Sequence, residues 1–169
     1  VMFGKTIGNG YALTAVLGKK SVMEAAQNTF ISSTFWTERI GPTAALATLK
    51  VMERIESWKT ITETGSKMQK GWLKLAEENN LDITVSGIAA MTTYGFNSPN
   101  AAAYKTLITQ EMLKKGFLAS THFYACTEHT DEHLDVYFNA LGDIYNTIHK
   151  CESQALDINS LLDGPICHA

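Results

Sequence analysis

Proline and cysteine are scarce in this sequence of 169 residues, which has three of each. The cysteines Cys126, Cys151 and Cys167 are widely spaced and form no Cys-x-x-Cys pair, which excludes a disulfide-dense secreted scaffold and indicates reduced thiols. No apolar run approaches the roughly 20 residues that a membrane span needs. The first residues, Val-Met-Phe-Gly-Lys, also lack the apolar stretch and cleavage site of a signal peptide. We therefore expect a cytoplasmic protein with no membrane partner.

An excess of charge of one sign is lacking as well. The 14 lysines and arginines are set against 17 acidic residues, and the net charge of -3 is spread along the chain. This distribution gives no basic surface for nucleic acid. The 45% of hydrophobic residues is enough to bury the core of one ordinary domain. An initiator methionine is missing at the start, so we expect this chain to be part of a longer protein.

Glycine interrupts the first 40 residues before any helical period can build, which predicts strand and loop there with one short helix from Ser21. From Pro42, apolar residues recur at helical spacing and predict a long helix. A break is expected between Thr60 and Gly65, followed by a second helical stripe that ends near Asn80. Residues 1–40 carry too little apolar surface for a core of their own.

The remaining chain, residues 81–150, reads as β-β-α-β-α. Two strands are predicted to meet around Ser86 and Gly87. A helix capped by Ser98 follows, then a short strand and a long helix capped by Thr130. This order predicts an α+β fold with helices on one face of a mainly antiparallel sheet. We expect three regions: 1–40, the remnant of a large domain; 41–80, connecting helices; and 81–169, a small α+β domain.

Lys5 is the first candidate for chemistry, because it lies at a strand end among glycines. It is either a solvated turn residue or an amine of lowered pKa that forms a Schiff base with an aldehyde cofactor, while the flanking glycines let a flat ring approach the backbone. A third interpretation takes Gly4-Lys5-Thr6 as the end of a phosphate-binding Walker loop. That interpretation requires a helix directly after Thr6, and the sequence Ile-Gly-Asn-Gly-Tyr is a poor helix start.

A second cluster, of acidic residues and histidines, lies between residues 128 and 133 and has ligand types that metals use. Its spacing matches no familiar metal site. Thr130 is a natural helix N-cap that places acidic side chains where the helix dipole favours them. We therefore expect helix capping and no metal site from these residues: Glu128, His129, Asp131, Glu132 and His133.

The stretch Gly4-Lys5-Thr6-Ile7-Gly8-Asn9-Gly10-Tyr11, continuing to Gly18, resembles the cofactor-lysine segment of class III pyridoxal-phosphate aminotransferases, closest to glutamate-1-semialdehyde aminomutases. Three further stretches resemble the family in order and spacing, so that the likeness covers nearly the whole chain: Ser33-Thr34-Phe35 ahead of Gly41-Pro42, the strand at 87–96, and Gly116 to Ser120 leading to His129-Thr130-Asp131-Glu132.

The resemblance implies a fold-type-I enzyme, with this chain as its C-terminal part and pyridoxal 5'-phosphate as its cofactor. Lys5 would hold the cofactor as a Schiff base and move a proton at the substrate's α-carbon, acting as the catalytic residue. Thr34 would bind the cofactor phosphate, typically that of the other subunit of a homodimer. The substrate would be a small amino or keto compound.

Departures from the family pattern bear on the substrate and on activity. Asn9 and Ala12 stand where aminomutases usually have glycine and proline, and a longer segment, residues 35–40, precedes Pro42; this favours an aminotransferase as much as an aminomutase. Within that segment, Glu38 and Arg39 are candidates for substrate contact or for a surface salt bridge. The family's remaining cofactor-binding residues precede the lysine segment, so we expect this chain alone to be inactive. The alternative is a non-catalytic, free-standing α+β binding or assembly module.

Overall fold

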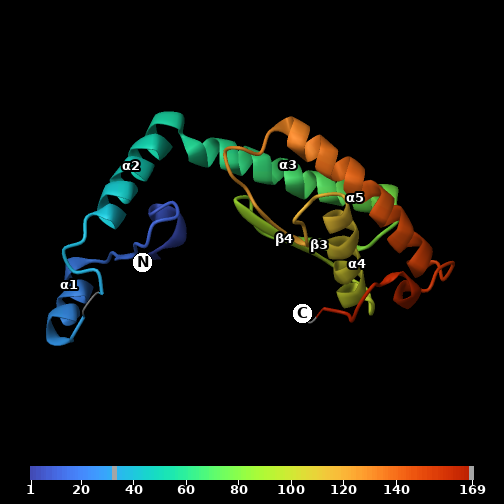
Figure 1. The fold of residues 1–169 in the computed structure, drawn as a ribbon, viewed down its shortest axis with the longest axis horizontal. Helices are drawn as coiled ribbons and strands as arrows, with labels where there is room; N and C mark the ends of the chain where they lie inside the picture. Colours follow the sequence, from blue (N-terminus) through green and yellow to red (C-terminus); the bar gives the residue numbers. More distant parts are fainter. Residues whose placement is uncertain (32–33, 168–169) are drawn as a thin grey trace. The chain divides into compact units, whose positions relative to one another are not determined.

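The computed structural model describes residues 1–31 and 34–167, which fall into two compact units, residues 1–57 and residues 58–169. Figure 1 shows the course of the chain through both units. Each unit is described by itself below. No helix in the described part of the chain is both long and apolar enough to cross a membrane. The finer division at residues 40 and 80 stays a prediction.

The first unit is built from short elements and one long helix. Strand β1 (Met2–Phe3) pairs antiparallel with β2 (Ala15–Val16), so that Met2 lies opposite Val16. A short helix, α1 (Lys20–Met23), continues into a 3-10 helix (Glu24–Asn28). Helix α2 (Ile40–Ile55) completes the unit.

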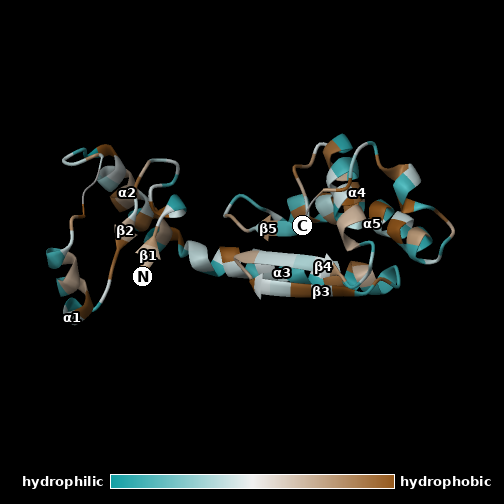
Figure 2. Ribbon diagram, turned by 90° about the horizontal axis from the view of Figure 1, so that it is seen from below, coloured by the Kyte–Doolittle hydropathy of each residue, from teal (hydrophilic) through white to brown (hydrophobic). Residues whose placement is uncertain are grey.

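A hydrophobic core is almost lacking in this unit. Ala45 is its one buried hydrophobic residue among those described. Most of the apolar side chains on α2 are exposed, and Figure 2 shows apolar colour on α2, β1 and β2. The sequence indicates too little periodic apolar surface in residues 1–40 to form a core. In the structure, residues 1–57 bury almost no hydrophobic side chain.

The junction after α2 corrects one sequence expectation. Glu56 adopts a left-handed conformation with φ of 47°, and helix α3 (Ser57–Glu78) begins directly after it. The break therefore lies at Glu56 and not between Thr60 and Gly65, which lie within one continuous helix. Helix α2 also begins two residues before Pro42. Pro42 therefore lies in the first turn of the helix, where the missing N–H of proline costs no helical hydrogen bond.

The second unit contains a three-stranded antiparallel sheet in the order β3-β4-β5, formed by Ile83–Ile88, Met91–Phe96 and His122–Tyr124. Ile88 pairs with Met91, so the chain turns at residues 89–90. The predicted turn at Ser86 and Gly87 is wrong by two to three residues. Gly87 instead lies within β3 with φ of 86°, and a Cβ there would lie 2.5 Å from the carbonyl oxygen of Met91. Glycine is used here for a close strand approach within the hairpin.

Three helices cover one face of this sheet: α3, α4 (Ala101–Lys114) and α5 (Asp131–Glu152). Tyr94 and Phe96 on β4 are buried in the core, whereas Gly95 between them is exposed. Helices α3 and α5 run side by side in the same direction (Figure 1), and a Cβ on Gly71 of α3 would lie 2.1 Å from the ring of Phe138 on α5. The predicted α+β order and the one-sided sheet are confirmed.

Aromatic residues dominate the core of the second unit. The indole of Trp72 is fully buried, lies 4.6 Å from the ring of Tyr94 and donates from Nε1 to the hydroxyl of Tyr137 at 3.0 Å. Buried aromatic pairs of this kind stabilise a fold beyond the area they bury. The other fully buried large side chains come from the three helices and β4: Tyr104, Tyr145, Met68, Ile108, Met112, Leu141, Ile148 and Thr92.

The helix caps agree with the sequence at one position and differ at another. Thr130 caps α5 as predicted: its hydroxyl accepts from the backbone N–H of His133, and the His133 ring accepts from the N–H of Thr130. Helix α4 has Asn100 at its N-cap, with no side-chain capping bond. The predicted cap, Ser98, instead accepts from the Asn100 N–H and donates to Glu152 at 2.6 Å, so it ties the start of α4 to the end of α5.

Candidate functional site

Lys5 follows β1 directly and is the first residue of a three-residue 3-10 helix, Lys5–Ile7. Its backbone is left-handed, with φ of 51°, a conformation that non-glycine residues rarely adopt. Strained backbone of this kind clusters at active sites and ligand clamps. The Nζ atom has no hydrogen-bond or ion-pair partner among residues 1–31 and 34–167, and the side chain is exposed.

The loop after Lys5 turns tightly and packs against the start of α2. A Cβ on Gly8 would lie 2.1 Å from the carbonyl oxygen of Tyr11, and one on Gly41 would lie 2.7 Å from that of Ala12. Both glycines are therefore required for close backbone approach. The turn from Gly8 to Gly10 directly after the 3-10 helix also differs from a Walker loop, which would require an α-helix at that point.

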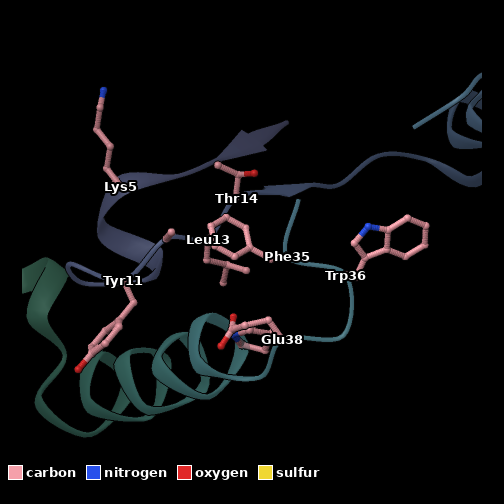
Figure 3. Close-up of a pocket in the computed structure, with 9 residues that line it drawn as sticks. Lys5, Tyr11, Leu13, Thr14, Phe35, Trp36 and Glu38 are labelled. Carbon is pink, nitrogen blue, oxygen red and sulfur yellow. The ribbon is translucent and has the colours of Figure 1, made fainter. Parts of the chain in front are cut away.

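A cavity of about 420 Å³ lies between this loop, the segment before α2 and the helix itself. Figure 3 shows Lys5 extending away from the other labelled side chains, so that its amine lies at the border of the cavity and not inside it. The lining is aromatic on two sides and contains Lys5, Tyr11, Ala12, Leu13, Thr14, Phe35, Trp36, Glu38 and Pro42.

Glu38 is one of the two candidates for substrate contact, and the structure gives it a local role. Its carboxylate accepts hydrogen bonds from the backbone N–H groups of Ile40 and of Gly41, the latter at 3.3 Å. These bonds satisfy N–H groups of the first turn of α2, where a negative charge also suits the helix dipole. Arg39, the other candidate, is the exposed N-cap residue of α2 and makes no side-chain capping bond.

Thr34 is exposed and does not line the cavity beside Lys5. The neighbouring Ser33 of the same motif lies outside the described residues. The structure thus places Lys5 and Glu38 at one cavity but does not bring Thr34 to it. Two lining aromatics, Tyr11 and Trp36, were not singled out from the sequence as site residues, because only the folded loops bring them to one place.

Between residues 128 and 133, helix capping accounts for the histidines. The His129 ring accepts from the Cys126 N–H at 3.1 Å, while His133 completes the cap at Thr130. Among the described residues, no group of three or more histidine, cysteine or acidic side chains is placed to hold a metal ion.

Comparison with known families decides what kind of protein carries this site. The profile of the Aminotransferase class-III family matches residues 1–144. The chain belongs to the class-III aminotransferase family. The match includes Lys5 and its loop, α2 and the second unit up to Ile144, so the family resemblance inferred from the sequence motifs is confirmed.

Curated relatives of this class-III chain carry out amino-group chemistry. It is 30% identical over 154 residues to 3-aminobutyryl-CoA aminotransferase of Cloacimonas acidaminovorans, covering 88% of this chain and 37% of that protein. It is also 30% identical over 159 residues to glutamate-1-semialdehyde 2,1-aminomutase of Clostridium botulinum, covering 83% and 37% of the two chains. The class-III chain thus spans a little over a third of the length of these relatives.

A solved structure confirms the class-III fold. The PLP internal aldimine form of the Sphingopyxis sp. MTA144 FumI protein matches with a TM-score of 0.79 at 20% identity, covering 95% of this chain and 39% of that one. A transaminase solved with PLP bound matches with a TM-score of 0.73 at 19% identity, over 90% and 39% of the chains. At these identities the likeness establishes the fold alone.

Proposed function

We propose that this chain is the C-terminal portion of a pyridoxal-phosphate-dependent enzyme that moves amino groups between small amino and keto compounds. The observation that carries the proposal is Lys5: a free amine on strained backbone at the edge of a cavity, in a chain that belongs to the class-III aminotransferases. The aminomutase and aminotransferase relatives support both variants of the reaction.

The residues around Lys5 fit the aldehyde end of such a cofactor. A primary amine without an ion-pair partner can attach an aldehyde, and the rings of Tyr11, Phe35 and Trp36 line a space suited to a flat molecule. When bound, pyridoxal phosphate would supply a ring that withdraws electrons from the substrate's α-carbon. Lys5 Nζ would hold the cofactor and then carry the proton to and from that carbon.

The phosphate group of the cofactor requires cations or hydrogen-bond donors. The cavity is lined by no cation apart from Lys5. We propose that Thr34 binds the cofactor phosphate. Thr34 is exposed and does not line this cavity, which is consistent with a contact to the cofactor of a second subunit. In this assignment the enzyme is a homodimer in which each site takes Lys5 from one subunit and Thr34 from the other.

The chain alone would then be inactive, because neither the phosphate site nor the group that tunes the cofactor ring is assembled around Lys5. The near absence of a core in residues 1–57 supports the same conclusion, since this unit needs further protein surface to be stable. A non-catalytic binding or assembly module remains the alternative, and it predicts a stable, well-packed first unit.

An activity assay tests the proposal. We expect the longer polypeptide that contains this chain to transfer amino groups with added pyridoxal phosphate, and this chain alone to show no turnover. In the longer polypeptide, Lys5→Ala should abolish turnover, whereas Lys19→Ala, a matched change of an exposed lysine in the same unit, should leave it intact. Equal activity of the Lys5→Ala and Lys19→Ala variants would refute the assignment of Lys5.

A further inference from the structure

A second cavity, of about 410 Å³, lies entirely within the second unit and takes no part in the proposed reaction. It is open to solvent and is lined by α3, by the segment between α4 and β5, by β5, by the segment between β5 and α5 and by the first turns of α5. Its lining is mostly apolar, with three imidazoles and one carboxylate: Met68, Phe117, Leu118, Ala119, His122, Phe123, Cys126, Glu128, His129, His133, Leu134 and Tyr137.

The walls of this cavity are held in place by the fold. The rings of Phe123 and His129 lie 4.8 Å apart, and those of Phe117 and Tyr137 lie 6.2 Å apart at a steep angle. The Tyr137 hydroxyl accepts from the buried indole of Trp72. The cavity is therefore pre-formed, which reduces the entropy cost of binding.

The charge at the cavity is negative. Glu128 is exposed, lines the cavity, and its carboxylate has no partner among residues 1–31 and 34–167. No lysine or arginine lines the cavity. Lys67, which precedes the lining residue Met68 on α3, is held by Asp131 at 2.7 Å and by Glu63 at 3.1 Å. An anionic ligand would thus find no free cation here.

His129 does not change this balance at neutral pH. The Nδ1 atom of His129 accepts from the N–H of Cys126, which requires an unprotonated Nδ1. Burial, with the neighbouring His133 as a second cause, lowers the pKa of His129 from its usual 6.5. The His129 ring is therefore neutral at pH 7 and does not repel a bound cation.

We propose that this cavity is a binding site for a small organic amine in its ammonium form, with the cation at Glu128 and an apolar body against the rings of Phe123 and Tyr137. Two observations carry the proposal: the unpaired carboxylate at a mostly apolar, pre-formed cavity, and the lack of any cation in its lining. Aromatic faces next to a carboxylate favour an ammonium group over a neutral or anionic one. The site requires neither Lys5 nor a cofactor, so amine binding here can be tested independently of the proposed reaction.

A pair of ligands of similar size and opposite charge tests this site. Phenethylamine and phenylacetate are titrated separately into this chain without cofactor, and the ring C–H resonances of the histidines are followed by NMR. We expect saturable shifts of His129 and His133 with phenethylamine and none with phenylacetate. Glu128→Gln should weaken phenethylamine binding about two- to fivefold, the range of an exposed ion pair.

Glu132→Gln is the matched control, because Glu132 is an exposed carboxylate in the first turn of α5 that does not line the cavity. It should leave the affinity unchanged. Ala119→Phe, which fills the cavity, should abolish binding, and circular dichroism verifies that this variant is folded. The proposal is overturned if phenethylamine produces no saturable shift, if phenylacetate binds equally well, or if the two glutamine variants have the same affinity.

Discussion

Replacing Tyr137 by phenylalanine removes one oxygen and leaves a buried donor without a partner. The Trp72 side chain is fully buried, and its Nε1 donates to the Tyr137 hydroxyl at 3.0 Å. A buried donor left unsatisfied costs about 1–3 kcal/mol. With a urea m-value of about 2 kcal/mol/M, the unfolding midpoint should fall by about 0.5–1.5 M.

Tyr145→Phe is the matched control, on the same helix. The Tyr145 hydroxyl is also buried; it interacts with the Tyr94 hydroxyl but makes no hydrogen bond of standard distance and angle among the described residues. Its removal should therefore lower the midpoint by less than Tyr137→Phe does, since no well-formed bond is broken. Urea unfolding followed by far-ultraviolet circular dichroism measures both variants. Equal midpoints for Tyr137→Phe and Tyr145→Phe would refute the role given to the Trp72–Tyr137 bond.

Three further predictions concern the second unit. Thr130→Ala should reduce the free energy of unfolding by about 1 kcal/mol because α5 loses its N-cap, and Thr130→Ser should retain most of the stability. Thermal or urea unfolding measures both variants, and an unchanged unfolding midpoint for Thr130→Ala would contradict the role of the cap. Leu141→Ala, at a fully buried position, should cost about 2–5 kcal/mol, and a loss under 1 kcal/mol would show that the core is looser than described. The pKa of His129 is lowered by burial and by His133, so the folded state favours its neutral form; its contribution to stability is complete above about pH 6.5 and is lost as the pH falls through the lowered pKa. The loss of stability between pH 7.5 and pH 5 should therefore be smaller in His129→Asn than in the unchanged chain, and identical losses would remove His129 as the cause.

The sequence predicts those parts of the fold that local patterns determine. The order of strands and helices after residue 80 follows from periodicity and turn residues, and Thr130 is recognisable as a cap because a polar residue is followed by acidic ones and then by an apolar stripe. The helix break is different. It lies at Glu56, where a charged residue takes a left-handed conformation that no local signal announces.

The hairpin shows the same limit. Gly87 is a natural turn residue, yet β3 passes through it because the Ile88 to Met91 pairing places the turn at residues 89–90. Pairing between strands, which the sequence does not display, outweighs the local preference of glycine.

At the candidate site, the sequence proposes Lys5 because its flanking glycines and the resemblance to a family both single it out, and its catalytic role stays a prediction. Tyr11 and Trp36 cannot be identified in this way, because they reach the same cavity only through the packing of the loop on α2. Similarly, the ion pair between Lys67 and Asp131 joins residues 64 positions apart in the sequence, and no local pattern predicts it.

Mapping the lysine that binds pyridoxal phosphate tests the central claim most directly. The chain is mixed with a low concentration of pyridoxal phosphate, borohydride makes the amine–aldehyde linkage permanent, and peptide mass spectrometry locates the label in the unchanged chain and in Lys5→Ala. The account predicts that the label concentrates on the peptide containing Lys5 and disappears in the variant. Labelling spread evenly over Lys19, Lys20 and the remaining lysines, and unaltered by Lys5→Ala, would contradict it.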